Sequence, residues 1–512
     1  MLMMFSSIFI AAILAWKFKQ AAPPSAEERE QKEDTVKPTK RGKRKRKGSG
    51  RVQEVVSPAS TTSRLSAAQV KSLEIQWRAI LEGGCGPGAS PGLSASVVLD
   101  GSLLFSGATG VVDREASPTT ALTDRHVLHC ASLAKVVVAA AVVQLEEEGK
   151  LKLEDAVCQH VPYFGLGDPV QWDHFDLGVD TAAQKVTIYH MLTHTGGIPD
   201  VHDDEYGWGV SDSSEGAAEA YVRSLREKEQ MIGAPGHVSM YSNIAFNVLA
   251  HLIAKVSGQS FESYVKERIF QPLGMQDSTF FYPEVPQGLR SQGHDKKVAV
   301  RAKVYPYNRA MAGSSTLNSS ARDMSRFMLA MLQGGVLDGR RFLSEAGVAK
   351  LWHKNETGRF FFCYPCPVES IGLAWFLGEH RSHMVVEHEG EDDGFCAYIV
   401  MVPELHAGVF LASNWEKTPS EKLAYRILNC LLDAMGCSAG IDESDSASSS
   451  SSSSDSEDEP PPPCTKDPTS PTKPNNTKRN PTSPAKSANK HKGKATQKAT
   501  VSPSSSSSSD SE

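Results

Sequence analysis

Residues 130–145 read CASLAKVVVAAAVVQL, and this stretch decides the fold because a polar start runs straight into a long apolar segment. An apolar run without a polar face is typical of a buried helix. Positions i and i+3 share one face of a helix, so the Ser132 hydroxyl and the Lys135 amine are expected to meet. A serine needs a neighbouring base to become a nucleophile, and burial turns a lysine into that base by lowering its pKa. The stretch therefore predicts a nucleophile and its base in the first turn of a buried helix.

The Ser-x-x-Lys spacing alone is a weak signal, because the chain contains it several times. The other copies are Ser263/Lys266, Ser470/Lys473, Ser483/Lys486 and Ser487/Lys490. Ser132 differs from them because three further segments follow it in a fixed order. These segments are MLTHTGGIP at 191–199, Tyr241-Ser242-Asn243 before an apolar helix, and His388-Glu389-Gly390 at the end of a strand-like segment.

The two ends of the central region favour a shared antiparallel sheet. Helical spacing over Leu65–Glu82 precedes a hairpin around Asp100-Gly101, the strongest short turn signal in this part of the chain. Strand-like segments recur later, at Met384–Glu387, Phe395–Val402 and Gly408–Ala412, before a closing helix over Glu421–Met435. The chain between these ends is mostly helical. We therefore predict a helical insertion on one sheet, with a cleft between the two parts.

Together these segments resemble the serine β-lactamase-like family over roughly Gly83–Asn414. That family contains class C β-lactamases, D-Ala-D-Ala carboxypeptidases, related esterases and eukaryotic mitochondrial-type β-lactamase-like proteases. The resemblance implies an α+β, β-lactamase/transpeptidase-like fold, in which helices flank an antiparallel sheet that carries an inserted helical subdomain. It also implies that the chain is an enzyme.

The resemblance implies the catalytic residues one by one. Ser132 would be the nucleophile, Lys135 its base, and Tyr241 would share the proton transfers with Lys135. The Asn243 amide would hold Lys135 or the acyl amide of the substrate. His194, in a Leu-Thr-His-Thr-Gly turn, is expected to fix the backbone by hydrogen bonds and not to transfer a proton.

The third motif implies the substrate-binding residues. His388 and Gly390 would lie on an edge strand whose backbone leaves room for an extended acyl chain. The N–H groups of Glu391 and Ser132 would form the oxyanion hole. Such donors typically contribute about 2.7–4 kcal/mol each to transition-state stabilisation.

The third motif also departs from the family pattern. Its middle position commonly holds a hydroxyl or a glycine, whereas this chain has Glu389, followed by Glu391, Asp392 and Asp393. Four carboxylates around one strand end would repel a substrate carboxylate. We therefore predict weak or no β-lactamase activity, and better turnover of neutral or cationic esters and amides.

The predicted function is that of a serine hydrolase, which cleaves an amide or ester bond through an acyl-Ser132 intermediate without a metal or cofactor. The expected partner is a small-molecule or peptide acyl substrate, and the sequence leaves open whether copies of the chain form a homo-oligomer. The alternative is a catalytically silent, membrane-tethered scaffold whose tail recruits partners. The presence of Ser132, Lys135 and Tyr241 together counts against that alternative.

Composition excludes several other classes of protein. The 512 residues include 40% hydrophobic residues and carry a net charge of −6, which excludes fibrous, collagen-like and small disulfide-framework proteins. The nine cysteines are odd in number and scattered, which favours a reducing compartment. Cys363 and Cys366 form a lone Cys-x-x-Cys without further zinc ligands at a recognisable spacing. We expect a loop with two thiols or a small disulfide there.

The chain divides into four regions. Residues 1–18 are an apolar anchor or signal, 19–65 a charged disordered linker, 66–436 the hydrolase domain, and 437–512 a disordered tail rich in Ser, Pro, Lys and acids. An uncleaved anchor in membrane lipid, followed by basic residues, would place the body on the cytosolic side. A secretory signal and a mitochondrial targeting segment are the alternatives.

Two charged segments outside the hydrolase domain suggest partners. The basic run at 40–47 is typical of a nuclear signal or a nucleic-acid arm, but no aromatic residues interleave with it to stack on bases. No nucleic acid is therefore expected. Serines followed by acids, such as Ser444, Ser456 and Ser509, predict a kinase that acts on the tail.

Overall fold

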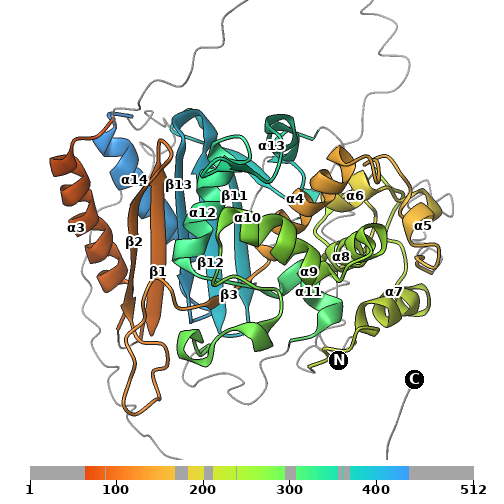
Figure 1. Cartoon of the computed structure of the whole chain (residues 1–512), viewed down its shortest axis with the longest axis horizontal. Coiled ribbons are helices and arrows are strands. Elements are labelled where there is room, and N and C mark those ends of the chain that lie inside the picture. The colour runs from red at the N-terminus through yellow and green to blue at the C-terminus, as the bar shows by residue number, and fades with distance from the viewer. Residues whose placement is uncertain are drawn as a thin grey trace, which may run out of the picture. The chain divides into compact units, whose positions relative to one another are not determined.

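The structure is a computed structural model of the chain that describes residues 64–86, 88–167, 183–200, 211–237, 239–294, 307–355, 361–362 and 370–437. The predicted anchor, nearly all of the predicted linker and tail, and the Cys363/Cys366 pair lie outside the described residues. Among the helices of the described part, none is long and apolar enough to cross a membrane. Figure 1 shows a central sheet with helices on both sides.

The centre of the described part of the chain is a seven-stranded antiparallel sheet with strand order β2-β1-β13-β12-β11-β10-β9. The strands are β1 (Gly92–Leu99), β2 (Ser102–Gly110), β9 (Ser370–Ile371), β10 (Phe376–His380), β11 (His383–Asp392), β12 (Phe395–Val402) and β13 (Ala407–Ser413). β1 pairs with β13, so strands from the two ends of the domain share the sheet as predicted. The predicted hairpin turn is also present, since Asp100 and Gly101 join β1 to β2 with positive φ.

Two helices from the ends of the domain cover one face of the sheet. α3 (Ala67–Gly83) begins after Ser66, whose side chain forms a capping box with Gln69. α14 (Ser420–Ala434) packs beside it, and the buried Trp77 of α3 donates its indole N–H to the Ile427 carbonyl oxygen of α14 at 3.1 Å. Figure 1 shows both helices at one side of the sheet. The sequence predicted both.

The other face of the sheet carries α12 and the inserted helical subdomain, which confirms the predicted architecture. α12 (Ala321–Leu332) packs on β1 and β13. Beyond it, α4 (Ala134–Glu147) lies among α8 (Asn243–Ser257), α11 (Ala312–Ser315) and α13 (Glu345–Leu351). Every residue of α4 from Ala134 to Leu145 is buried, because this helix has neighbours on all sides. Figure 1 shows the subdomain on the far side of the sheet from α3.

Short elements complete the described part of the chain. The helices are α5 (Val157–His160), α6 (Ile188–Leu192), α7 (Ala217–Lys228), α9 (Phe261–Val265) and α10 (Gln271–Leu273). The strands are β3 (Leu128–Ala131), β4 (Ser239–Met240), β5 (Leu317–Ser319), β6 (Val336–Leu337), β7 (Arg340–Arg341) and β8 (Phe361–Phe362). β3 pairs with β5, contacts β11 and β12, and leads directly into α4. It therefore joins the sheet to the helical subdomain.

Candidate active site

The predicted nucleophile lies between β3 and α4. Ala131 has a φ of +45°, a left-handed conformation that L-residues adopt rarely, and it turns the chain from β3 towards the helix. Ser132 follows and is partly exposed, whereas Lys135 in the first turn of α4 is fully buried. The Lys135 Nζ lies 3.0 Å from the Ser132 Oγ, so the structure brings the predicted pair into hydrogen-bond contact.

The Lys135 amine has two further oxygen partners. Its Nζ lies 2.6 Å from the Asn243 Oδ1 and 2.9 Å from the Ser314 carbonyl oxygen. It also lies 4.7 Å from the centre of the Tyr241 ring. The structure therefore places the Asn243 amide on Lys135, which is one of the two roles that the resemblance implies. These contacts hold the Lys135 amine in place and direct it at the Ser132 hydroxyl.

The second motif is presented by the start of α8. The Ser242 side chain accepts a hydrogen bond from the Ala245 N–H and caps this helix, so Asn243 is the first helical residue. The Asn243 N–H donates to the Asp200 Oδ1 at 2.9 Å. Tyr241 precedes the cap and is half-buried, with its ring beside Lys135. The capped start of α8 therefore positions Tyr241 and Asn243, the two residues that the resemblance pairs with Lys135.

His194 supports this motif from behind. Its ring stacks on the Tyr241 ring at 4.6 Å, and its Nδ1 accepts the Ser242 N–H at 3.0 Å. Burial, followed by the charge of Lys135, lowers the pKa of His194 well below its usual value. The neutral ring then carries its proton on Nε2. The backbone contact agrees with the expected structural role of His194.

His388 of the third motif is buried beside Lys135. Its ring stacks on Phe376 at 4.7 Å, and its Nδ1 lies 2.6 Å from the Glu389 carbonyl oxygen. Burial first, and then the charge of Lys135, lower the pKa of His388 to about 3. A carbonyl oxygen only accepts hydrogen bonds, so Nδ1 must donate and Nε2 of the neutral ring is an acceptor. That Nε2 is buried and has no hydrogen-bond partner among the described residues.

Gly390 allows β11 to approach the nucleophile segment. A Cβ at this position would lie 2.1 Å from the Cys130 carbonyl oxygen and 3.0 Å from the Leu133 Cδ1. Real carbon and oxygen atoms do not approach so closely, so only glycine fits here. The β11 strand is therefore in direct backbone contact with the segment that carries Ser132.

Strand register shows where the Glu391 N–H points. A two-residue turn joins β11 to β12 and closes on the pair Asp392–Phe395. The residue pair that closes such a hairpin is hydrogen-bonded, and hydrogen-bonded and non-hydrogen-bonded pairs alternate along the two strands from there. The next pair, Glu391–Cys396, is therefore not hydrogen-bonded. The expected edge strand is an inner strand of the sheet, since β11 lies between β12 and β10, but among the described residues β10 pairs with β11 only as far as Glu387. The Glu391 N–H thus points to the open edge of β11, as an oxyanion-hole donor requires.

The prediction that the Glu389 carboxylate lies beside the substrate is wrong. Side chains alternate between the two faces of a strand, so Glu389 and Glu391 lie on the face opposite to His388. Burial, followed by the charges of Glu391 and Glu421, raises the pKa of Glu389 to about 7. Since Glu421 belongs to α14, the Glu389 side chain faces that helix. The sequence could not show this, because side-chain direction depends on strand register.

Asp392 is on the same face as His388 but already has a partner. Its Oδ2 lies 2.8 Å from the Nε2 of the buried His129. Neither this contact nor the Ser314 carbonyl at Lys135 was predicted from the sequence. The Ser314 partner is a backbone carbonyl, and His129 and Asp392 are 263 positions apart, so no local sequence pattern indicates either contact.

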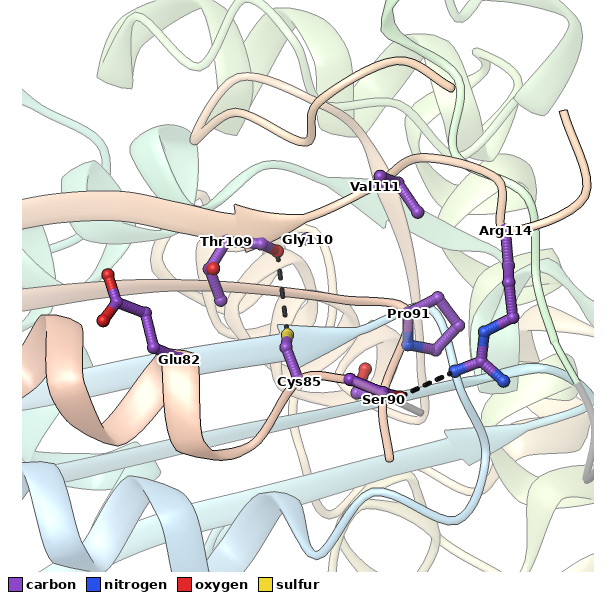
Figure 2. A pocket seen from close by; sticks show the side chains of 9 residues that line it. Glu82, Cys85, Ser90, Pro91, Thr109, Gly110, Val111 and Arg114 are labelled. Carbon is purple, nitrogen blue, oxygen red and sulfur yellow. Dashed lines mark hydrogen bonds between the residues drawn. The ribbon is translucent and has the colours of Figure 1, made fainter. Parts of the chain in front are cut away.

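A separate pocket lies at the end of α3. It has a volume of about 590 Å³, and its lining includes Glu82, Cys85, Thr109 and Arg114. Figure 2 shows the Cys85 thiol directed at the Thr109 carbonyl oxygen, 3.8 Å away. Burial raises the pKa of this thiol to about 11, which makes it a poor nucleophile. None of the residues of the three motifs lines this pocket.

Comparison with known proteins shows the family. A model of the Beta-lactamase family matches residues 77–431, so the chain belongs to that family and the predicted resemblance is confirmed. The D-alanyl-D-alanine-carboxypeptidase/endopeptidase AmpH of Escherichia coli (strain K12) is 24% identical over 295 residues, which are 56% of this chain and 70% of AmpH. The PbpX protein of Bacillus subtilis (strain 168) is 27% identical over 246 residues, which are 47% of this chain. The chain spans 55% of the length of PbpX.

A solved structure shows the same fold. The D-amino acid amidase from Ochrobactrum anthropi SV3, complexed with L-phenylalanine amide, superposes with a TM-score of 0.56 at 21% identity. The match covers 71% of this chain and 99% of the amidase. The predicted α+β, β-lactamase/transpeptidase-like fold is therefore confirmed. The family match and AmpH, which is named as a carboxypeptidase/endopeptidase, agree with the predicted class of enzyme.

Proposed function

We propose that the chain is a serine hydrolase that cleaves an ester or amide bond through an acyl-Ser132 intermediate. One observation carries this proposal, namely the three oxygen partners of the buried Lys135. The Lys135 ammonium directs N–H groups at the Ser132 Oγ, the Asn243 Oδ1 and the Ser314 carbonyl oxygen. When it loses the proton directed at Ser132, the lone pair that remains faces the Ser132 hydroxyl and can accept its proton, while Asn243 and Ser314 accept the other two N–H groups.

The proposed reaction begins when the Ser132 Oγ attacks the acyl carbon and passes its proton to Lys135. The negative charge that develops on the acyl oxygen is stabilised by the N–H groups of Ser132 and Glu391. The bond to the leaving group then breaks, and the leaving group takes a proton from Lys135 through the Tyr241 hydroxyl. A water molecule next attacks the acyl-Ser132 carbon and gives one proton to Lys135 through the Tyr241 hydroxyl. Lys135 then protonates the Ser132 Oγ as the bond between Ser132 and the acyl group breaks. This step releases the acid and restores Ser132.

The third motif supports a preference for neutral or cationic substrates. His388 is neutral and offers a buried acceptor at Nε2, so it binds a donor better than a substrate carboxylate. AmpH is named as a D-alanyl-D-alanine carboxypeptidase, and the amidase structure contains L-phenylalanine amide, an uncharged amide at its reacting end. We propose that this chain resembles the amidase in substrate charge, and that it is an inefficient β-lactamase.

The test of this function compares two matched serines. Ser132→Ala should abolish hydrolysis of a neutral ester such as p-nitrophenyl butyrate. Ser263→Ala should not change it, because the Ser263/Lys266 pair has the same spacing but is exposed, with Lys266 paired to Glu284 at 3.1 Å. Hydrolysis by Ser132→Ala at a rate within a few-fold of the wild type would overturn the proposal. No hydrolysis by the wild type would favour the silent scaffold instead.

The substrate preference has its own test. The ratio of kcat/KM for a methyl ester to that for the matching free carboxylate should exceed one in the wild type. His388→Lys should lower this ratio, because it replaces a neutral acceptor by a cation. A ratio below one in the wild type would show that this site selects carboxylates.

We also propose that residues 1–18 anchor the chain in a membrane. The apolar composition of residues 1–16, which carry no charged side chain, supports the proposal, although residues 1–18 lie outside the described residues. Alkaline extraction of membranes should retain the full chain and release a chain that lacks these residues. Release of both chains would contradict the anchor.

A further inference from the structure

The two donors of the proposed oxyanion hole come from separate parts of the fold. Ser132 follows β3, whereas Glu391 lies on the open edge of β11. β3 pairs with β5 and not with β11, so no shared hydrogen-bond ladder sets the distance between the two N–H groups. Gly390 contacts the Cys130 carbonyl. Because glycine has no side chain, Gly390 permits this close approach but cannot hold the two segments together.

One side-chain contact does connect the two segments. The His129 Nε2 lies 2.8 Å from the Asp392 Oδ2, and the two side chains are only 3% and 12% exposed. His129 stands three positions before Ser132, and Asp392 directly follows Glu391. The His129 and Phe395 rings also pack in a T-shaped arrangement with their centres 5.9 Å apart, which restricts the orientation of His129.

We propose that the His129–Asp392 contact is a brace that holds Ser132 and Glu391 at the spacing the oxyanion requires. Gly390 leaves room for the two segments to approach closely, and the His129–Asp392 contact holds them together. His129 and Asp392 are positioning residues in this view, since they act through the backbone of their neighbours. This inference rests on the proposed function, because it assigns a role within the same reaction.

The brace predicts a particular kinetic effect. The oxyanion exists only in the transition state, so a looser oxyanion hole lowers kcat and leaves KM nearly unchanged. A displacement of about 1 Å at a reacting group can cost about 100-fold in rate. Loss of the brace should therefore lower kcat by at least about ten-fold. Partial unfolding would also lower the apparent kcat at unchanged KM, so kcat is calculated per folded molecule, with the folded fraction measured by circular dichroism.

The experiment uses the full chain with p-nitrophenyl butyrate, below the melting temperature of every variant. His129→Ala and Asp392→Ala should each lower kcat by about ten-fold or more and change KM by less than about three-fold. Asp392→Asn keeps an acceptor oxygen for the imidazole and should recover most of the lost rate. The double variant should be no slower than the slower single variant, because both changes remove one contact.

A matched contact elsewhere in the fold provides the control. The His160 Nε2 lies 2.9 Å from the Asp155 Oδ2, and both side chains are partly buried. His160→Ala should leave kcat unchanged. The brace is overturned if His129→Ala loses no more rate than His160→Ala, or if Asp392→Asn is as slow as Asp392→Ala. A failure of the proposed function looks different, because the wild-type chain would then not be acylated at Ser132, and both proposals would fall.

Discussion

Replacing Gly390 by alanine tests the close approach of β11 to the nucleophile segment. The new Cβ would lie 2.1 Å from the Cys130 carbonyl oxygen, although such atoms rarely approach within 3.0 Å. The two backbones must therefore separate by roughly the 0.9 Å between these values, because the obstacle is main chain and cannot rotate away. Overpacking of this kind typically costs about 1–3 kcal/mol of stability.

The catalytic cost of Gly390→Ala should exceed its cost in stability. A shift of about 1 Å moves the Glu391 N–H away from the acyl oxygen, and we expect kcat to fall by about 100-fold. The loss of one oxyanion donor typically raises the activation free energy by a similar amount, about 2.7–4 kcal/mol.

The assay combines ester hydrolysis with thermal unfolding, and Gly378→Ala is the control. Gly378 lies on the neighbouring strand β10, where a Cβ would meet only the Val385 side chain at 3.3 Å and the Glu387 side chain at 3.8 Å. We expect Gly378→Ala to keep its kcat. If Gly390→Ala remains folded and retains kcat within about three-fold, the strand does not position the oxyanion hole as we argue.

Further predictions concern proton chemistry and the tail. Asn243→Ala removes the 2.6 Å acceptor of Lys135 and should lower kcat by about ten-fold or more, measured by ester hydrolysis. The pKa of Glu389 is raised to about 7, so the stability that the protonated carboxyl contributes is present at acid pH and is lost as the pH rises through 7. Glu389→Gln cannot ionise and should therefore raise the melting temperature more at alkaline than at acid pH. The pKa of His388 is lowered to about 3, so the free energy of unfolding should fall as the pH decreases below the usual histidine range, and His388→Gln should reduce that fall in urea titrations. A chain that ends near residue 439 should keep its kinetics, and mass spectrometry of the chain from cells should find phosphate on tail serines.

Local patterns in the sequence predicted the parts of the structure that depend on neighbouring residues. The apolar run after Lys135 identified α4, and helical spacing brought Ser132 and Lys135 together. Asp100-Gly101 identified the first hairpin because few other residue pairs adopt positive φ in succession. The order of the motifs then indicated the family, and with it Tyr241 and Asn243.

Side-chain direction and distant contacts could not be predicted in the same way. Glu389 was placed beside the substrate, but its face follows from the register of β11, which the sequence does not specify residue by residue. The Ser314 partner of Lys135 is a backbone carbonyl and has no side-chain signature. His129 and Asp392 are brought together only when β3 reaches the end of β11.

The central claim is that Ser132 carries the acyl group, and the location of a covalent adduct tests it most directly. The intact chain is incubated with a serine-reactive phosphonate ester, digested and mapped by mass spectrometry. Our account predicts one phosphonyl group on the peptide that contains Ser132 and none on the Ser263 peptide, with labelling lost in Ser132→Ala. An adduct on another serine, or no adduct while ester hydrolysis continues, would contradict it.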